Sequence, residues 1–467
     1  MATQKANMGY IIFLSAVAAI GGILFGYDTA VISGTTGVVA SQFSLNALSQ
    51  GWYVGCALIG SILGVICAGM MSDRLGRRLT MIIAALLFSV SAAGCALCTG
   101  FGQLVVFRII GGVGIGVVSI VSPIYISEVA PAGKRGTLVS MYQLAVTIGF
   151  LVAYLANFGI LDHAEASTDG GGWWDRLFIG EYWRGMLGCE LLPDLLFLCV
   201  ILLIPESPRW LIVNGRPDKA GIVFQHIYGN EEAVAAQISE TTASIHGEVK
   251  SEWRVILEPG IFKAVLIGSA IAILGQFMGV NAVLYYGPQI FEDAGLSSAD
   301  SLWSQVLIGA VNMLTTIIAL VIIDKVGRKK LVYWGVSGMI VCLLMIGIFF
   351  LCGGALGLGN GFLLVFFLAY VFCTAISISA VVFVLLSEMY PNRARGVAMS
   401  IAGLALWVGT YLIGQLTPWM LENLTPAGTF FLFAFMCVPY MLIMWRLVPE
   451  TTGKTLEEIE AWWTEKG

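Results

Sequence analysis

Ionisable side chains stand inside long apolar runs of this sequence, where an ion is costly unless it is paired or hydrated. Asp28 and Arg108 lie at similar depths in their runs, counted in residues. An arginine beside an acid favours the ionised acid, whereas burial favours the protonated acid. A conformational change that separates the two groups or dries the site would therefore make Asp28 bind or release a proton. A static structural ion pair is the alternative.

Two further acids occupy another apolar run. Glu190 and Asp194 are four residues apart, on one face of a helix, with Pro193 between them. The role of Asp194 is open between a position that lines a solvated cavity and a second proton-binding site.

Amide side chains in the apolar runs are candidates to bind a sugar. Sugar hydroxyls donate and accept hydrogen bonds, as amides do, and a flat aromatic side chain covers the apolar face of the ring. Gln276 and Asn281 face one way only if their helix is broken, and Gly275 and Gly279 offer a place for a break. Packing between helices is the alternative role for any one buried amide. The predicted sugar-binding residues are Gln143, Gln276, Asn281, Tyr285, Asn312, Phe383 and Trp407.

Matched acids and arginines stand at the ends of the apolar runs. Opposite charges there can hold two helix bundles together on one side of a membrane and release them when the protein opens on that side. The alternative is topology determination by basic residues, which needs no acids. The predicted gating residues are Asp73, Arg77, Glu128, Arg135 and Glu206 in the first half and Asp324, Arg328, Glu388, Arg395 and Glu450 in the second.

The elements that position these residues follow from composition. Of 467 residues, 58% are hydrophobic and 11% are charged, and the mean hydropathy is +0.88. Because soluble domains carry about 25% charged residues, this composition excludes a soluble enzyme, a nucleic-acid binder and a disordered chain. The net charge of −5 indicates no polyanionic partner. A helical protein that crosses the lipid bilayer many times remains.

Twelve apolar runs have the length of about 20 residues that a membrane helix needs. The polar stretch 205–261 divides them six and six and is predicted to hold short soluble helices. Basic residues concentrate in alternate short loops, so these loops, the polar stretch and both termini are predicted to face the cytoplasm. The short loops favour a bacterial inner membrane. The runs lie near 10–32, 52–71, 79–98, 102–125, 138–160, 184–204, 262–287, 303–323, 330–352, 362–386, 395–418 and 428–447.

Three motifs recur in the same order in both halves of the chain. DRLGRR at 73–78 matches DKVGRK at 324–329, SEVAPAGKRG at 127–136 matches SEMYPNRARG at 387–396, and PES at 205–207 matches PET at 449–451. Two homologous six-helix halves are typical of transporters that alternate access to a central site. The predicted domains are a six-helix bundle at 1–204, a cytoplasmic helical linker at 205–261, a six-helix bundle at 262–449 and a cytoplasmic tail at 450–467.

The chain resembles the sugar porter family of the major facilitator superfamily, and within it the bacterial proton-coupled xylose symporters. The motifs that carry the resemblance include GYDTAVISG at 26–34, RIIGGVGIG at 108–116, PESPRW at 205–210, GQFMGVNAVLYYGPQIF at 275–291 and PETTGKTLEE at 449–458. The resemblance implies an all-α membrane fold of twelve helices in two six-helix repeats, with the sugar between them near the bilayer midplane. It also implies that Asp28 binds the coupled proton and that Glu190 supports proton movement.

Several positions depart from the family's pattern. Phe150, Gly275 and Leu406 stand where the family typically has polar residues. In the tenth run, Ser379, Ala380 and Phe383 stand where a Gly-Pro pair and a tryptophan are expected. A buried hydrogen bond between neutral groups contributes about 0.5–1.5 kcal/mol, so losing two or three weakens binding of a standard pentose or hexose by roughly tenfold or more. The identity of the sugar is therefore open.

The predicted function is proton-coupled symport of a monosaccharide, with a xylose-like sugar favoured, by alternating access. A proton-independent facilitator for a sugar or an inositol-type polyol is the alternative. A non-transporting sugar receptor is less favoured, because the tail after the last apolar run is short. An enzyme embedded in the membrane is disfavoured because no histidine lies in an apolar run. We expect no cofactor or metal; the expected partners are a sugar, the proton and the lipid bilayer, and the expected state is a monomer.

Overall fold

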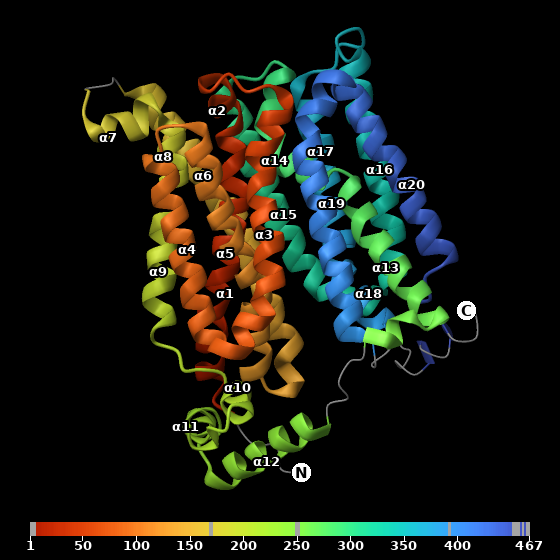
Figure 1. Cartoon of the computed structure of the whole chain (residues 1–467). Coiled ribbons are helices and arrows are strands. Elements are labelled where there is room, and N and C mark those ends of the chain that lie inside the picture. The colour runs from red at the N-terminus through yellow and green to blue at the C-terminus, as the bar shows by residue number, and fades with distance from the viewer. Residues whose placement is uncertain are drawn as a thin grey trace. The chain divides into compact units, whose positions relative to one another are not determined.

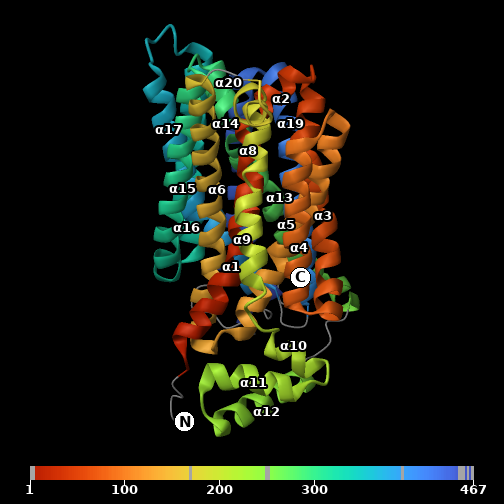
Figure 2. The same cartoon turned by 90° about the vertical axis from the view of Figure 1, so that its left-hand side faces the viewer.

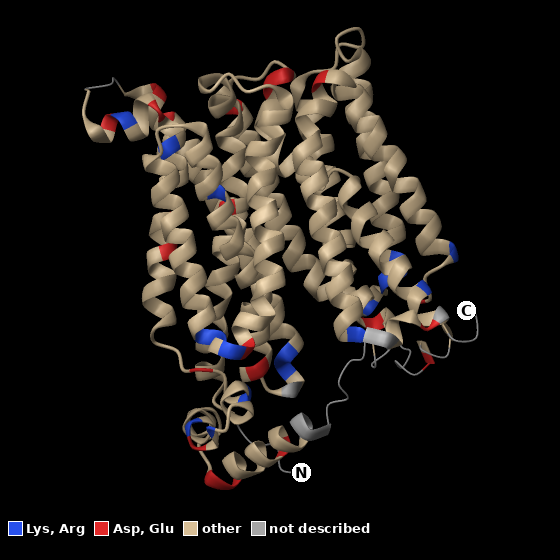
Figure 3. Ribbon diagram, in the orientation of Figure 1, with Lys and Arg blue, Asp and Glu red and all other residues tan. Residues whose placement is uncertain are grey.

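The predicted helical architecture is present. A computed structural model of the chain describes residues 6–167, 171–247, 253–390, 394–450, 458–459 and 462–463. No strand occurs among these residues, and eleven helical segments are long and apolar enough to cross a membrane. Charged residues gather at the helix ends (Figure 3). Most of the predicted tail at 450–467 lies outside the described residues.

Seven helices and a divided sixth span form the first half of the chain. The helices of the first five spans are α1 (Met8–Val31), α3 (Ala47–Leu75), α4 (Arg77–Leu97), α5 (Phe101–Val129) and α6 (Arg135–Ala166), with short helices α2 (Thr36–Gln42) and α7 (Trp173–Asp175) in loops. The predicted run 184–204 instead holds α8 (Tyr182–Gly188) and α9 (Leu191–Ile201), so it is not one of the eleven long segments. Pro193 has no N–H to bond the carbonyl of Cys189, which accounts for the interruption next to Glu190.

Short helices fill the predicted insert at 205–261. They are α10 (Pro208–Val213), α11 (Pro217–Tyr228) and α12 (Glu231–Gly247), and they lie together beyond one end of α4, α5 and α9 (Figures 1 and 2). Ser207 caps α10 by accepting a hydrogen bond from the backbone N–H of Trp210 at 3.3 Å, and Pro208 takes the first helical position, where its missing N–H is harmless.

The second half repeats the pattern of long helices. These are α13 (Pro259–Phe277), α14 (Val280–Asp293), α15 (Ser298–Val326), α16 (Arg328–Cys352), α17 (Asn360–Thr374), α18 (Ala380–Met389), α19 (Arg395–Asn423) and α20 (Thr425–Arg446). A π-helical turn at Ala375–Ser379 joins α17 to α18, so the two form one long segment.

The chain packs into two compact units. Unit 1 comprises Met1–Thr29, Ile59–Ala153 and Gly171–Val249, and unit 2 comprises Ala30–Leu58, Tyr154–Gly170 and Lys250–Gly467. Helices α1, α3 and α6 each run from unit 1 into unit 2. One end of each of these first-half helices therefore packs with helices of the second half. The predicted domain division at 204, 261 and 449 stays a prediction.

Close backbone contact explains part of the high glycine content. A Cβ atom added at Gly64 on α3 would lie 2.3 Å from the carbonyl oxygen of Val113, and one added at Gly116 on α5 would lie 2.2 Å from the carbonyl oxygen of Ser61. Only glycine allows two helices to approach so closely, which is how membrane helices gain packing contacts. These glycines therefore hold α3 close to α5, the helix that carries Arg108.

Candidate functional site

Asp28 and Arg108 form a buried ion pair between α1 and α5. The Nη1 atom of Arg108 donates a hydrogen bond to Oδ1 of Asp28, and the side chains are 3% and 1% exposed. The same Nη1 lies 3.4 Å from the carbonyl oxygen of Asp28. Gly111, one turn beyond Arg108, leaves room for the carboxylate, because an added Cβ would lie 3.3 Å from Oδ2 of Asp28. The contact expected from the matching depths of the two residues is present.

Glu190 and Asp194 are buried near this pair. Their exposed fractions are 2% and 0%, and both carboxyl groups interact electrostatically with Asp28. Oε1 of Glu190 and both carboxyl oxygens of Asp194 have no hydrogen-bond partner among the described residues. Complete burial of Asp194 does not fit a position that lines a solvated cavity.

A cluster of polar side chains lies at a break between α13 and α14 in unit 2. Gly279 has a φ of 90° and separates the two helices where the sequence offered a break. The break lets Nδ2 of Asn281 donate a hydrogen bond of 2.7 Å to Oε1 of Gln276. Oγ1 of Thr410 on α19 lies 3.2 Å from the same oxygen. Sequence reasoning missed Thr410, although it stands three residues after Trp407 and so on the same helix face.

The other predicted sugar-binding residues are dispersed. Tyr285 is buried on α14, Asn312 and Trp407 are half-buried on α15 and α19, and Phe383 on α18 is 50% exposed. These four belong to unit 2 with the polar cluster. Gln143 is exposed on α6 within unit 1. Their part in binding stays a prediction.

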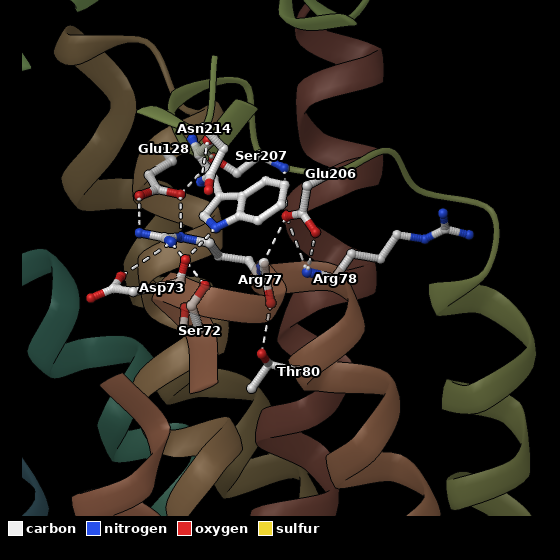
Figure 4. Close-up of polar contacts among 11 residues, drawn as sticks. Ser72, Asp73, Arg77, Arg78, Thr80, Glu128, Glu206, Ser207 and Asn214 are labelled. Atoms are coloured by element: carbon white, nitrogen blue, oxygen red, sulfur yellow. Dashed lines mark hydrogen bonds and ion pairs between the residues drawn. The ribbon is translucent and has the colours of Figure 1, made fainter. Parts of the chain in front are cut away.

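Arg77 at the start of α4 binds Glu128 at the end of α5 through two N–H groups on one edge of its guanidinium group (Figure 4). Nη2 donates to Oε1 over 2.9 Å and Nε donates to Oε2 over 3.0 Å. Asp73 adds a weaker contact at 3.4 Å. The hydroxyl of Ser207, a residue that sequence reasoning did not select, donates to Oε2 of Glu128. The network joins α3, α4, α5 and the start of α10 within unit 1.

Glu206 caps the N-terminus of α4 from outside the helix. Its Oε1 accepts hydrogen bonds from the backbone N–H groups of Arg77 (2.9 Å), Arg78 (3.2 Å) and Ser207 (2.8 Å). The N-cap residue Gly76 has no side chain to do this, and its φ of 94° with ψ of 163° is open only to glycine. Burial raises the pKa of the Glu206 carboxyl, and the backbone hydrogen bonds oppose the rise only in part.

The second half repeats part of this arrangement. Nη2 of Arg328 at the start of α16 lies 2.8 Å from Oε1 of Glu388 on α18, and Gly327 before it has a φ of 95°. Nη2 of Arg395 lies 3.4 Å from the carbonyl oxygen of Tyr390.

Three of the predicted gating residues remain. Glu450 is half-buried and interacts electrostatically with Tyr333, Arg135 is exposed, and the side chain of Asp324 lies outside the described residues. The two acid–arginine pairs each join helices of one half. The predicted bridging of the two halves stays a prediction.

Comparison with known proteins places the chain in a family. The family model described as "Sugar (and other) transporter" matches residues 14–463. The chain belongs to this family. It is 36% identical over 461 residues to the arabinose-proton symporter of Bacillus subtilis (strain 168), covering 99% of this chain and 97% of that protein. It is 37% identical over 496 residues to the D-xylose-proton symporter of Escherichia coli (strain K12), covering 98% and 96%.

A solved structure agrees with the predicted architecture. The inward open conformation of the xylose transporter XylE from E. coli matches with a TM-score of 0.83 and 35% identity, over 97% of this chain and 100% of that chain. The match confirms the fold of about twelve membrane helices in two repeats. The family confirms the resemblance seen in the motifs and makes the chain a transporter rather than an enzyme.

Proposed function

We propose that the chain is a proton-coupled sugar symporter that works by alternating access. The observation that carries the proposal is the buried ion pair of Asp28 with Arg108, in a family whose similar members include proton symporters for arabinose and xylose. A buried carboxylate beside a permanently charged arginine is a group whose protonation changes the local charge by a full unit.

Proton binding and the ion pair exclude each other. A protonated Asp28 is a neutral acceptor for the charged Arg108, so the attraction between α1 and α5 weakens when the proton binds. Asp28 stands two residues before the point where α1 passes from unit 1 to unit 2. Loss of the Asp28–Arg108 contact therefore alters α1 at the point where this helix passes from one unit to the other. Protonation of Asp28 can in this way be coupled to a rearrangement of the helices.

The polar cluster of Gln276, Asn281 and Thr410 is the proposed core of the sugar site. Three side chains from three helices meet at a broken helix, and the Gln276 amide and the Thr410 hydroxyl can each donate to and accept from a sugar hydroxyl. Trp407 on the same helix as Thr410 and Tyr285 near the cluster supply aromatic surface for the sugar ring. The proposed substrate is a monosaccharide, pentose or hexose, and the remaining members of the site are Gln143, Asn312 and Phe383.

The protein is a multi-pass membrane protein, and we propose that it lies in a bacterial inner membrane as a monomer. Basic loops support an orientation with α10–α12 and both termini in the cytoplasm. In this orientation the Arg77–Glu128 and Arg328–Glu388 pairs lie on the cytoplasmic side. The proposed organisation is two bundles at 1–204 and 262–449 joined by the linker at 205–261.

Sugar uptake into proteoliposomes tests the proposal. Arabinose, xylose, glucose and inositol are offered with and without an inward proton gradient to the wild type, to Asp28→Asn and to Asp218→Asn, a control on the exposed face of α11. We expect the wild type and the control to accumulate one sugar against its gradient. Asp28→Asn should lose accumulation and keep counterflow exchange. Equal, gradient-independent equilibration by all three proteins would show a facilitator instead.

A further inference from the structure

An apolar groove opens between α16 and α20 in unit 2, at the end where α16 begins and α20 ends. The two helices pack along each other (Figure 1). Tyr333 from α16 and Met441, Leu442 and Trp445 from α20 line a space of about 320 Å³. Both helices are long and apolar enough to cross a membrane, and Leu442 and Trp445 are 49% and 62% exposed. Apolar side chains this exposed on a membrane helix face lipid, so the groove opens to the bilayer.

Aromatic side chains mark the end of the groove next to the helix termini. The hydroxyl of Tyr333 lies 3.5 Å from the carbonyl oxygen of Met444 on α20. Trp334, the next residue on α16, is 81% exposed. Tyrosine and tryptophan favour the depth at which the hydrocarbon meets the lipid headgroups. The groove therefore extends from the hydrocarbon, beside Met441 and Leu442, to the level of the headgroups.

Cations from both helices stand at this end of the groove (Figure 3). Arg446 is exposed in the last turn of α20, and its guanidinium carbon lies 5.2 Å from the centre of the Trp445 ring. Lys330 is exposed in the first turn of α16. It stands three residues before Tyr333 and four before Trp334, so it shares their helix face. Two positive charges therefore flank the aromatic end of the groove.

Two more charged groups lie beside Tyr333. Nζ of Lys329 lies 5.9 Å from the centre of the Tyr333 ring and donates a hydrogen bond of 2.8 Å to the carbonyl oxygen of Val448, beyond the end of α20. Glu450 interacts electrostatically with Tyr333. The three basic residues at the groove, less this one acid, leave an excess of two positive charges. This end of the groove therefore attracts an anion.

We propose that the groove binds an anionic phospholipid, with an acyl chain along Met441 and Leu442 and the phosphate between Arg446 and Lys330. Such a lipid joins an apolar chain to a negative headgroup, which matches an apolar groove that ends in cations. A zwitterionic phospholipid fits the same groove, but its amine cancels the attraction. In the proposed orientation this lipid belongs to the cytoplasmic leaflet. Lipid binding here does not depend on proton-coupled symport.

Native mass spectrometry of the full chain in detergent tests the proposal. The protein is titrated with phosphatidylglycerol or with phosphatidylethanolamine that carries the same acyl chains. Each Lys or Arg near an anionic lipid strengthens binding by roughly 5-fold. We expect the wild type to bind phosphatidylglycerol more tightly than phosphatidylethanolamine. Arg446→Gln should weaken phosphatidylglycerol binding about 5-fold, and the double variant with Lys330→Gln about 25-fold, with phosphatidylethanolamine unchanged.

Three further variants separate the charge from the groove and from folding. Lys325→Gln is the matched control, since it removes an exposed cation in the last turn of α15, a helix that contributes none of the groove's lining residues. Arg446→Lys keeps the charge and should keep phosphatidylglycerol binding, which guards against a folding defect at this position. Leu442→Asn puts a polar group into the wall of the groove and should weaken both lipids by the same factor.

The outcomes identify what occupies the groove. Equal phosphatidylglycerol binding by the wild type and the double variant would overturn the site, and so would equal affinity of the wild type for the two lipids. A dimer that the double variant loses, with lipid binding unchanged, would assign the groove to a second copy of the chain instead. Because binding is measured without transport, a failure of symport in the uptake experiment leaves these outcomes untouched.

Discussion

The side-chain amide of Gln50 on α3 donates a hydrogen bond of 2.7 Å to Oε1 of Gln289 on α14, across 239 residues of sequence. Nearby in unit 2, Nε2 of Gln415 donates to the carbonyl oxygen of Leu48 at 2.9 Å. The hydroxyl of Tyr154 donates to the carbonyl oxygen of Leu284 at 3.1 Å. These contacts fasten ends of first-half helices to the second half, and alternating access requires them to break when that end opens.

Gln289→Leu should loosen this end of unit 2. A buried hydrogen bond contributes about 0.5–1.5 kcal/mol net, so we expect amide hydrogen exchange in α14 to become about 2- to 12-fold faster. Mass spectrometry on the detergent-solubilised protein measures the exchange. Gln103→Leu is the matched control, because Oε1 of Gln103 accepts hydrogen bonds from Thr99 in the adjacent loop and not from the second half of the chain as far as the structure describes it. Equal exchange rates in α14 of both variants would contradict a fastening role for Gln50 and Gln289.

Gly76→Ala should destabilise the protein strongly. The backbone conformation of Gly76 costs a residue with a Cβ about 1–3 kcal/mol, and the added Cβ would lie 2.3 Å from Oε2 of Glu206. We expect a lower thermal unfolding temperature in detergent and a low yield of folded protein. Gly136→Ala on α6 is the control, since its Cβ would meet no atom within 4 Å. The prediction fails if the two variants unfold at the same temperature.

Much of the fold could be predicted because few kinds of protein structure can span a bilayer. The low charge content required membrane helices, and the repeated motifs required two halves. The break at Gly279 followed from glycine beside an amide pair. The contacts of Thr410 and Ser207 could not be predicted, since they depend on how distant helices pack. From the sequence, Glu206 could be predicted only as a gating residue. Nothing in its spacing shows that its carboxylate caps a helix that begins at Arg77.

Removing Gln276 should weaken sugar binding more than removing Asn312. Oε1 of Gln276 accepts from Asn281 and lies near the Thr410 hydroxyl, which also donates to the carbonyl oxygen of Leu406. Gln276→Ala therefore removes one sugar partner and the acceptor that orients the Asn281 amide. Losing two or three hydrogen bonds at about 0.5–1.5 kcal/mol each raises the KM of uptake by roughly tenfold or more. Asn312→Ala removes a single amide. Initial rates of uptake over a range of sugar concentrations measure both, and a smaller rise for Gln276→Ala would remove the cluster from the site.

The Arg77–Glu128 pair should be coupled more strongly than its counterpart in the second half. The side chains of Arg77 and Glu128 are 12% and 7% exposed and make two parallel hydrogen bonds, whereas Glu388 in the Arg328 pair is 26% exposed. Double-mutant cycles with glutamine at each position measure the coupling as changes in unfolding free energy. We expect about 1–2 kcal/mol for the first pair and below about 1 kcal/mol for the second. A larger coupling energy for the Arg328–Glu388 pair than for the Arg77–Glu128 pair would contradict burial as the cause of the difference.

Glu206→Gln should change how stability depends on pH. Burial raises the pKa of Glu206 in the folded protein, so the folded state binds its proton more tightly than the unfolded state does. The stabilisation by that proton is complete below the unfolded pKa and is lost as the pH rises through the folded pKa. Glutamine keeps one carbonyl acceptor for the N–H groups of α4 and does not titrate.

The unfolding temperature of Glu206→Gln relative to the wild type should therefore rise between pH 4 and pH 7. Thermal unfolding in one detergent, at constant ionic strength, gives the difference at each pH. Asp218→Gln, an exposed acid replaced by the same amide, controls for the general loss of a negative charge. If the backbone hydrogen bonds to the Glu206 carboxylate outweighed its burial, the difference would fall with pH instead, and the helix-capping contact would be the dominant effect on this carboxyl group.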